Sequence, residues 1–133
     1  MEVTYQEFLE GKIDVAPLTG LDVKPEQLSP ALKPHQRDSV LWALRGGRRA
    51  LFAAFGLGKT VMQLEWTRIV AEMTGGRVLI VLPLNVRREF WDDAQNILHQ
   101  AAPPYVRTMA EAEATQAPVV MTNYERVRDG DIE

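Results

Sequence analysis

Hydrophobic residues in the middle of the chain alternate between strand-like runs and a helix-like stripe. Arg49–Ala54 and Arg77–Leu82 are short apolar runs of strand length. Between them, apolar residues recur at spacings of three and four: Met62, Trp66, Ile69 and Met73. This spacing predicts a helix over residues 59–73 with one buried face. Gly75-Gly76 follows, as glycine commonly does just past a helix C-terminus.

The pattern continues on both sides of this region. Val40, Leu41 and Leu44 share one face, so residues 35–45 predict a helix that begins after Pro34. Downstream, Asn85 is expected to cap a helix whose core-facing residues recur at helical spacing: Val86, Phe90, Ala94 and Ile97. The remaining predicted elements are a weaker strand at Tyr105–Met109, a short helix at Ala110–Gln116, a fourth strand at Pro118–Met121 and the start of a last helix at Asn123–Arg128.

These elements predict the fold class and the domain organisation. Residues 1–30 form an expected lead-in, with a short helix at Thr4–Leu9 and prolines too frequent for long elements. Residues 31–133 alternate strands with helices, which predicts an α/β fold with an open parallel sheet flanked by helices. The chain has four strand-like runs, whereas a typical sheet has about five or six strands, so the sheet is expected to be incomplete.

Composition and charge narrow the classes of function. The chain is 46% hydrophobic and 25% charged, which suits a packed globular domain. It has no cysteine and only two histidines, His35 and His99, so disulfides and thiolate metal sites are excluded and a histidine metal site is not expected. The formal net charge of −3 lacks the basic balance of a domain that binds nucleic acid by charge alone. The arginine clusters at 45–49 and 87–88 are interpreted as solvated surface.

No apolar run approaches the roughly 20 residues that span a bilayer, and the N-terminus lacks a signal-peptide pattern. We therefore expect no membrane partner and a cytoplasmic location.

One glycine-rich segment carries the predicted chemistry. Gly56 and Gly58 allow backbone angles that turn successive N–H groups around an anion, and the following helix adds its N-terminal partial charge. Lys59 is expected to reach the β- and γ-phosphates of a nucleotide, and the Thr60 hydroxyl to ligate magnesium. The segment follows a predicted strand and opens a predicted helix, as a phosphate-binding loop requires. The alternative is a glycine turn with a surface lysine. The predicted contacts to ATP are Ala54, Phe55, Gly56, Leu57, Gly58, Lys59 and Thr60.

Segments around this loop resemble those of superfamily 2 helicases and translocases, within them the Swi/Snf-like branch. Leu32–Trp42 is similar to the family's Q motif, which implies that Gln36 contacts the adenine edge. A primary amide offers the donors and acceptor that adenine needs, although an exposed helix residue is the alternative for Gln36 alone. Gly56-Leu57-Gly58-Lys59-Thr60 is typical of the branch, but Ala53 stands where the general pattern has glycine.

Two later segments add to the resemblance. Val81–Val86 with Phe90-Trp91 looks like motif Ia, which in the family touches the nucleic-acid backbone; a strand–turn–helix junction is the alternative. Val119–Glu125 resembles the strand that precedes the family's acidic motif, and it implies that Thr122 either contacts a phosphate or caps a helix. The resemblance implies a RecA-like domain over residues 31–133, with ATP and Mg²⁺ as cofactors.

Residues 1–133 contain no segment similar to the family's Asp-Glu motif or to its second RecA-like lobe. The chain is therefore expected to be the ATP-binding part of an ATP-dependent DNA helicase or translocase, which by itself binds Mg-ATP without efficient hydrolysis. DNA and a second polypeptide that supplies the remaining motifs are the expected partners. Two alternatives stay open: a small-molecule kinase, and a non-enzymatic interaction module with a remnant loop.

Overall fold

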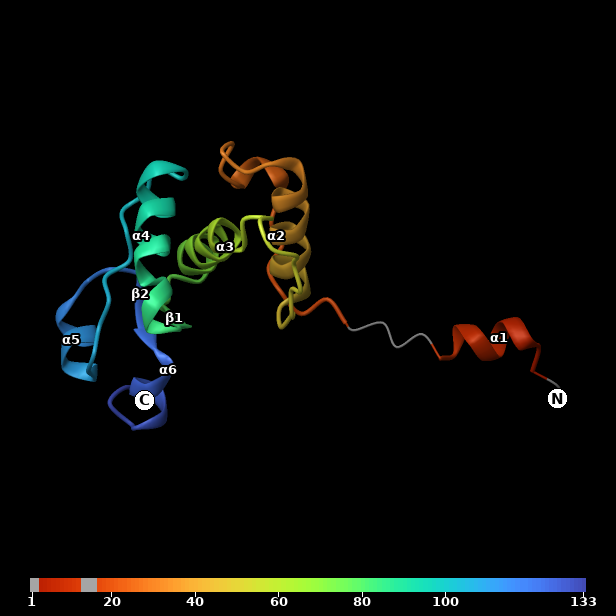
Figure 1. The fold of residues 1–133 in the computed structure, drawn as a ribbon. Helices are drawn as coiled ribbons and strands as arrows, with labels where there is room; N and C mark the ends of the chain where they lie inside the picture. The colour runs from red at the N-terminus through yellow and green to blue at the C-terminus, as the bar shows by residue number, and fades with distance from the viewer. Residues whose placement is uncertain (1–2, 13–16) are drawn as a thin grey trace.

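The computed structural model describes residues 3–12 and 17–133. In these ranges the chain forms α-helices, two 3₁₀ turns and a pair of strands (Figure 1). The elements in chain order are α1 (Tyr5–Glu10), η1 (Pro25–Gln27), α2 (Pro34–Gly46), α3 (Lys59–Thr74), β1 (Val78–Leu82), η2 (Leu84–Val86), α4 (Arg87–Asn96), α5 (Met109–Ala114), β2 (Val119–Asn123) and α6 (Tyr124–Arg128). The fold is therefore of mixed α/β character.

The sheet is small and parallel. β1 pairs with β2 in a register that joins Val78 to Val119 and Leu82 to Asn123. This confirms two of the four predicted strands and the predicted parallel direction. The crossover between the strands contains α4 and α5, in agreement with the strand–helix alternation of the sequence.

The strand predicted at Arg49–Ala54 is wrong. This segment carries no strand pairing, and the Phe52 side chain is 94% exposed. Leu51 lines a pocket of about 360 Å³ together with Leu79 and Val81 of β1, and β1 pairs with β2 rather than with this segment. The apolar run therefore forms no strand, because a strand needs a partner with which to pair.

The strand predicted at Tyr105–Met109 is reduced to a single bridge between Tyr105 and Met121. The chain leaves the sheet early because Thr108 caps α5, its hydroxyl accepting a hydrogen bond from the backbone N–H of Glu111 at 3.2 Å. Helix capping therefore ends the strand pairing after Val106.

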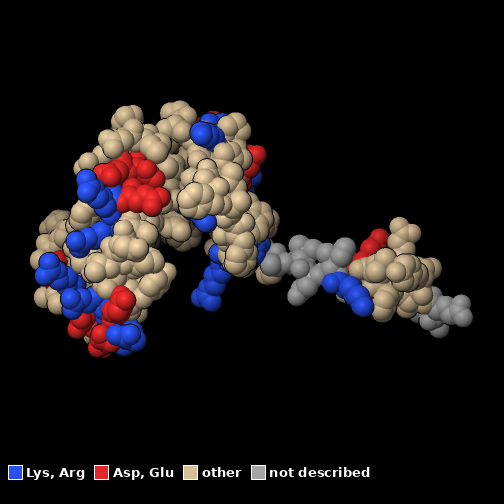
Figure 2. Space-filling model, viewed as in Figure 1, with Lys and Arg blue, Asp and Glu red and all other residues tan. Residues whose placement is uncertain are grey.

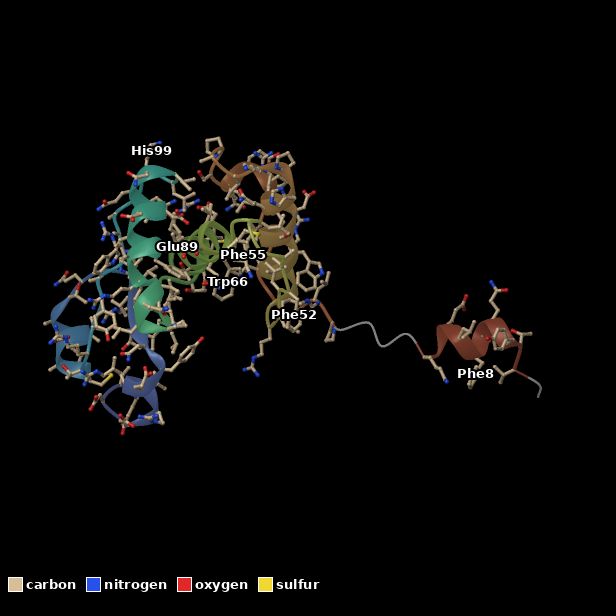
Figure 3. All side chains as sticks on the ribbon, viewed as in Figure 1. Phe8, Phe52, Phe55, Trp66, Glu89 and His99 are labelled. Atoms are coloured by element: carbon tan, nitrogen blue, oxygen red, sulfur yellow. The ribbon has the colours of Figure 1, made fainter. Side chains whose placement is uncertain are left out.

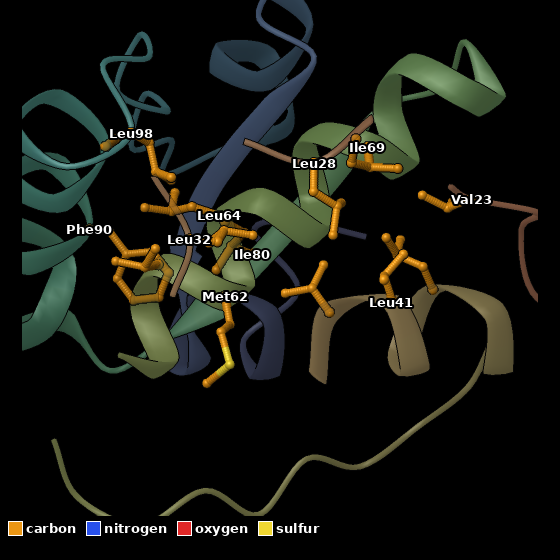
Figure 4. Close-up of a cluster of buried hydrophobic side chains, with 14 of the residues drawn as sticks. Val23, Leu28, Leu32, Leu41, Met62, Leu64, Ile69, Ile80, Phe90 and Leu98 are labelled. Atoms are coloured by element: carbon orange, nitrogen blue, oxygen red, sulfur yellow. The ribbon is translucent and has the colours of Figure 1, made fainter. Parts of the chain in front are cut away.

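α3 is the central element of the core. It packs between α2 and α4 and also contacts both strands (Figure 1). Two members of its predicted stripe, Met62 and Ile69, are buried in the cluster of Figure 4. Trp66 is half-buried, whereas Met73 in the last turn is exposed. Gly75 ends the helix in a left-handed conformation, as predicted.

The start of α4 differs from its prediction. Asn85 does not cap the helix, because it lies inside the 3₁₀ turn η2, and Val86 occupies the N-cap without a side-chain cap. Phe90 and Ala94 are buried as expected. Ile97 is exposed because α4 ends at Asn96, and Leu98 is buried in the core in its place.

Part of the predicted lead-in belongs to the packed core. Val23 and Leu28 are buried against the α2–α3 cluster, and the Leu21 backbone N–H donates to the Leu44 carbonyl at 2.8 Å. The predicted N-terminal helix is confirmed as α1, which has no buried residue and lies apart from the other elements in Figure 1. Residues 1–2 and 13–16 of the lead-in lie outside the described residues.

A buried carboxylate links three segments around α3. The Glu65 side chain is completely buried and accepts hydrogen bonds from the Ser29 backbone N–H at 2.9 Å and from Gln100 Nε2 at 3.2 Å. Arg68, one turn later, donates to the same carboxylate through Nε at 3.1 Å and forms an ion pair with it through Nη2. Arg68 Nη2 also donates to the Gln27 carbonyl at 3.1 Å. Glu65 and Arg68 form a structural hub, because their hydrogen bonds connect the lead-in and the segment after α4 to the central helix α3.

The surface charges are mixed. Basic and acidic side chains interleave over α5 and α6 on the face shown in Figure 2. There, Arg126 pairs with Asp131 at 2.8 Å and Arg128 with Asp129 at 2.8 Å. In the part of the chain that the structure describes, no helix is long and apolar enough to cross a membrane.

Candidate functional site

The glycine-rich loop joins the unpaired segment to α3. Gly56 and Gly58 both have left-handed backbone angles, with φ of 82° and 79°. Gly58 is the N-cap of α3, and the first intrahelical bond runs from the Met62 N–H to the Gly58 carbonyl at 3.1 Å. The N–H groups of the first turn before Met62 therefore have no intrahelical acceptor. Such a turn can accept an anion.

The first turn of α2 holds this loop in place. Gln36 Nε2 donates to the Leu57 carbonyl at 3.2 Å, and Gln36 Oε1 accepts from the Lys33 backbone N–H at 2.9 Å. His35 Nε2 also lies 3.1 Å from the Leu57 oxygen. Gln36 is only 6% exposed. One amide N–H and one lone pair of Gln36 remain after these contacts, so the adenine contact stays a prediction and loop positioning is an additional role.

Gln36→Ala is expected to lower the free energy of unfolding by about 1–2 kcal/mol, because it removes the cap of α2 and a buried hydrogen bond to the loop. Urea denaturation followed by circular dichroism measures this change. Ser39→Ala is the control, since the Ser39 hydroxyl bonds only locally to the His35 carbonyl in the same helix at 2.8 Å. A loss for Gln36→Ala no larger than that for Ser39→Ala would contradict the positioning role.

A pocket of about 630 Å³ opens in front of the loop. It is lined by residues of the loop, α3, the end of β1, α4 and the start of α6, including Lys59, Thr60, Glu89, Phe90 and Tyr124. Lys59 is exposed at the start of α3, whereas Thr60 is buried behind it. The structure therefore brings the predicted phosphate and metal residues to one pocket.

The other predicted contacts differ in their exposure. Gly56, Gly58 and Phe55 line the pocket, and Phe55 is fully exposed at the tip of the loop (Figure 3). Ala54 is exposed beside it, outside the pocket lining. Leu57 is also outside the lining, and its carbonyl points to α2.

Thr60 has a partner that the sequence did not indicate. Its hydroxyl donates to Glu89 Oε1 at 3.2 Å, across the interface of α3 and α4. Nearby on α4, burial raises the pKa of the Asp93 carboxyl, and the charges of Glu89 and Asp92 raise it further. Glu89 thus places a carboxylate on the α4 side of the pocket that also contains Lys59. No spacing rule connects position 60 with position 89, so only the packed structure could reveal this pair.

The oxygen atoms of Thr60 and Glu89 suit magnesium, which prefers oxygen ligands. Within residues 3–12 and 17–133 no group of three or more His, Cys, Asp or Glu side chains could hold a metal ion. A cation at this loop would therefore need further oxygens from a bound phosphate, which is how Mg²⁺ commonly binds with nucleotides.

The segments of the two later motifs serve the packing of the domain. Thr122 is completely buried and donates to the Val106 carbonyl at 2.9 Å. It does not cap α6, since Asn123 is the N-cap, so the cap alternative is wrong. Asn123 Oδ1 accepts from the Tyr105 hydroxyl at 2.6 Å, and Trp91 Nε1 donates to the Pro103 carbonyl at 2.8 Å.

The arginine clusters are more than solvated surface. Arg45 donates through Nε and Nη2 to the Val23 carbonyl at 3.1 and 2.8 Å. The guanidinium of Arg49 lies over the Trp42 ring, and that of Arg87 lies over Trp91. These contacts correct the sequence interpretation for three of the arginines, because each guanidinium has a backbone or aromatic partner within the protein.

A scan against protein-family models finds no match for this chain, and a search of curated proteins finds none either. The case for function therefore depends on the geometry of the loop and its pocket.

Proposed function

We propose that this chain is the ATP-binding part of an ATP-dependent DNA helicase or translocase of the RecA-like P-loop class. The observation that supports the nucleotide site most directly is the conformation of the loop. Two glycines with positive φ lead into the first turn of α3, where the backbone N–H groups, Lys59 and Thr60 meet at one pocket. This is the arrangement that phosphate-binding loops use.

Each residue has a separate role in the proposed site. The first turn of α3 receives the phosphates, and Lys59 adds a mobile positive charge against the β- and γ-phosphates. The Thr60 hydroxyl is the protein ligand for magnesium. The cation, when bound with the nucleotide, neutralises phosphate charge. Gln36 fixes the loop and contacts adenine through its remaining hydrogen-bonding groups.

Hydrolysis by the chain alone is expected to be inefficient. Phosphoryl transfer needs several charged groups placed around the transferring phosphate at once. Lys59 and Thr60 supply two such groups, and the resemblance implies that further ones come from the Asp-Glu motif and a second lobe. The proposed activity of the chain by itself is thus ATP binding. DNA is the proposed partner of the complete helicase or translocase.

Lys59→Ala is expected to weaken the binding of Mg-ATP by about tenfold or more, because a phosphate loses its cationic partner. Isothermal titration calorimetry of the full chain with Mg-ATP measures the effect. The control Lys24→Ala removes an exposed lysine outside the pocket lining and should bind as wild type does. Equal affinities for wild type and Lys59→Ala would contradict the proposed site.

The alternatives predict different results in the same experiment. Competition among ATP, GTP and CTP tests the adenine contact, which a small-molecule kinase without a base reader would lack. A non-enzymatic interaction module would bind no nucleotide. It would show dimers or larger species by size-exclusion chromatography with light scattering, with the exposed Phe52 and Phe55 as contact residues.

A further inference from the structure

Glu89 is a charged residue of the pocket to which neither the motif nor its family resemblance gives a role. It lies in the first turn of α4, on the side that faces α3 (Figure 3). Its carboxylate accepts the Thr60 hydroxyl at 3.2 Å, although the two residues belong to different helices. Both residues line the pocket that contains Lys59.

The direction of this hydrogen bond matters for a cation at Thr60. A threonine hydroxyl has one proton and two lone pairs. When the proton is directed to Glu89, the lone pairs are left to face other partners. Acceptors behind a ligand commonly orient it and raise its basicity. Glu89 therefore prepares the Thr60 oxygen to act as a metal ligand.

The charge of Glu89 has a second effect. The Glu89 carboxylate lines the pocket that also contains Lys59, so it repels the phosphates of a metal-free nucleotide there. A divalent cation bound with the phosphates reverses the sign of the local interaction. The same side chain thus disfavours free ATP and favours the metal complex.

We infer that Glu89 is a positioning residue that makes nucleotide binding at this loop selective for the magnesium complex. The inference rests on the proposed function. It means that a residue of α4, in addition to the loop, determines which form of the nucleotide binds. The alternative is that Glu89 only joins α4 to α3 by its hydrogen bond to Thr60.

Glu89→Gln separates the two possibilities, because glutamine keeps the size of the side chain and an oxygen that accepts from Thr60 but removes the charge. The affinity of the full chain for ATP is measured by calorimetry twice, with excess Mg²⁺ and with excess EDTA. In wild type the magnesium complex should bind more tightly. In Glu89→Gln the ratio of the two affinities should fall by about fivefold or more, with metal-free ATP binding more tightly than it does to wild type.

Asp92→Asn is the matched control, since it removes one negative charge from an exposed position on the same helix, outside the pocket lining. It should leave the ratio close to the wild-type value. Thermal melting of each variant by circular dichroism confirms that the fold is kept. Should glutamine disturb it, Glu89→Asp serves as the second variant: it keeps the charge and must keep a preference for the magnesium complex.

The outcomes also separate this inference from the proposed function. A Glu89→Gln protein in which both affinities change by the same factor, or neither changes, overturns the role of Glu89 while the nucleotide site stands. A wild-type chain that binds ATP in neither condition overturns the nucleotide site, and the role of Glu89 with it.

Discussion

Arg68→Met should lower the free energy of unfolding by about 3–5 kcal/mol, the largest loss of stability that we expect from a single substitution in this chain. The reason is the complete burial of the Glu65 carboxylate that Arg68 neutralises. The hydrogen bonds that Arg68 donates to the Glu65 carboxylate raise the pKa of Arg68, in keeping with a stabilised ion pair. Without the guanidinium, a negative charge stays in the core, and among the described residues the Ser29 N–H and the Gln100 amide remain as its partners.

Urea denaturation monitored by circular dichroism measures this loss. Glu72→Gln is the control, because Glu72 forms the exposed ion pair of Arg68 at 2.9 Å and exposed pairs contribute about 0–1 kcal/mol. The double substitution Glu65→Gln with Arg68→Met should regain part of the stability, since no uncompensated charge remains. Stability of Arg68→Met within about 1 kcal/mol of wild type would show that the pair is not a structural hub.

Gly58→Ala should disrupt the loop much more than Gly56→Ala. Both glycines have positive φ, where an L-residue costs roughly 1–2 kcal/mol. At Gly58, however, a Cβ would also lie 2.2 Å from Gln36 Nε2, whereas at Gly56 it would meet no atom within 4 Å. The clash pushes out the amide that holds Leu57, so Gly58→Ala should lose about 2–4 kcal/mol of stability in total.

Binding of Mg-ATP should follow the same order, with Gly58→Ala the weaker binder. Thermal melting and calorimetry on the two variants measure stability and affinity side by side. If the two substitutions have equal effects on both, the contact between Gln36 and the loop does not set the loop conformation.

The sequence predicts the local elements better than their partners. The spacing of apolar residues locates α2, α3 and α4, and the branched aliphatic run 78–82 identifies β1. The run at 49–54 looks equally strand-like, yet it forms no strand, because a neighbouring strand cannot be inferred from the run itself. Cap positions fail for a similar reason: Asn85 is a good cap residue, but the chain bends into a 3₁₀ turn there.

In the candidate site, too, the sequence predicts the local part and misses the contacts between distant segments. The glycine spacing identifies the loop, Lys59 and Thr60 directly, because consecutive residues of one turn make that part of the site. Glu89 and the second role of Gln36 come from other helices, and the contacts of both depend on how α2, α3 and α4 pack. Side chains that approach the loop from elsewhere in the chain leave no periodic signal in the sequence.

The anchoring of the Leu57 carbonyl by Gln36 and His35 has a thermodynamic consequence for any ligand of the loop. Preorganised sites bind more tightly because less conformational entropy is lost at the moment of association. In this chain the loop is restrained by α2 before a ligand arrives, so much of the cost of ordering it is met during folding. The folding stability of α2 and the intrinsic affinity of the loop are thereby coupled: a substitution that frays the first turn of α2 should weaken binding without touching the ligand.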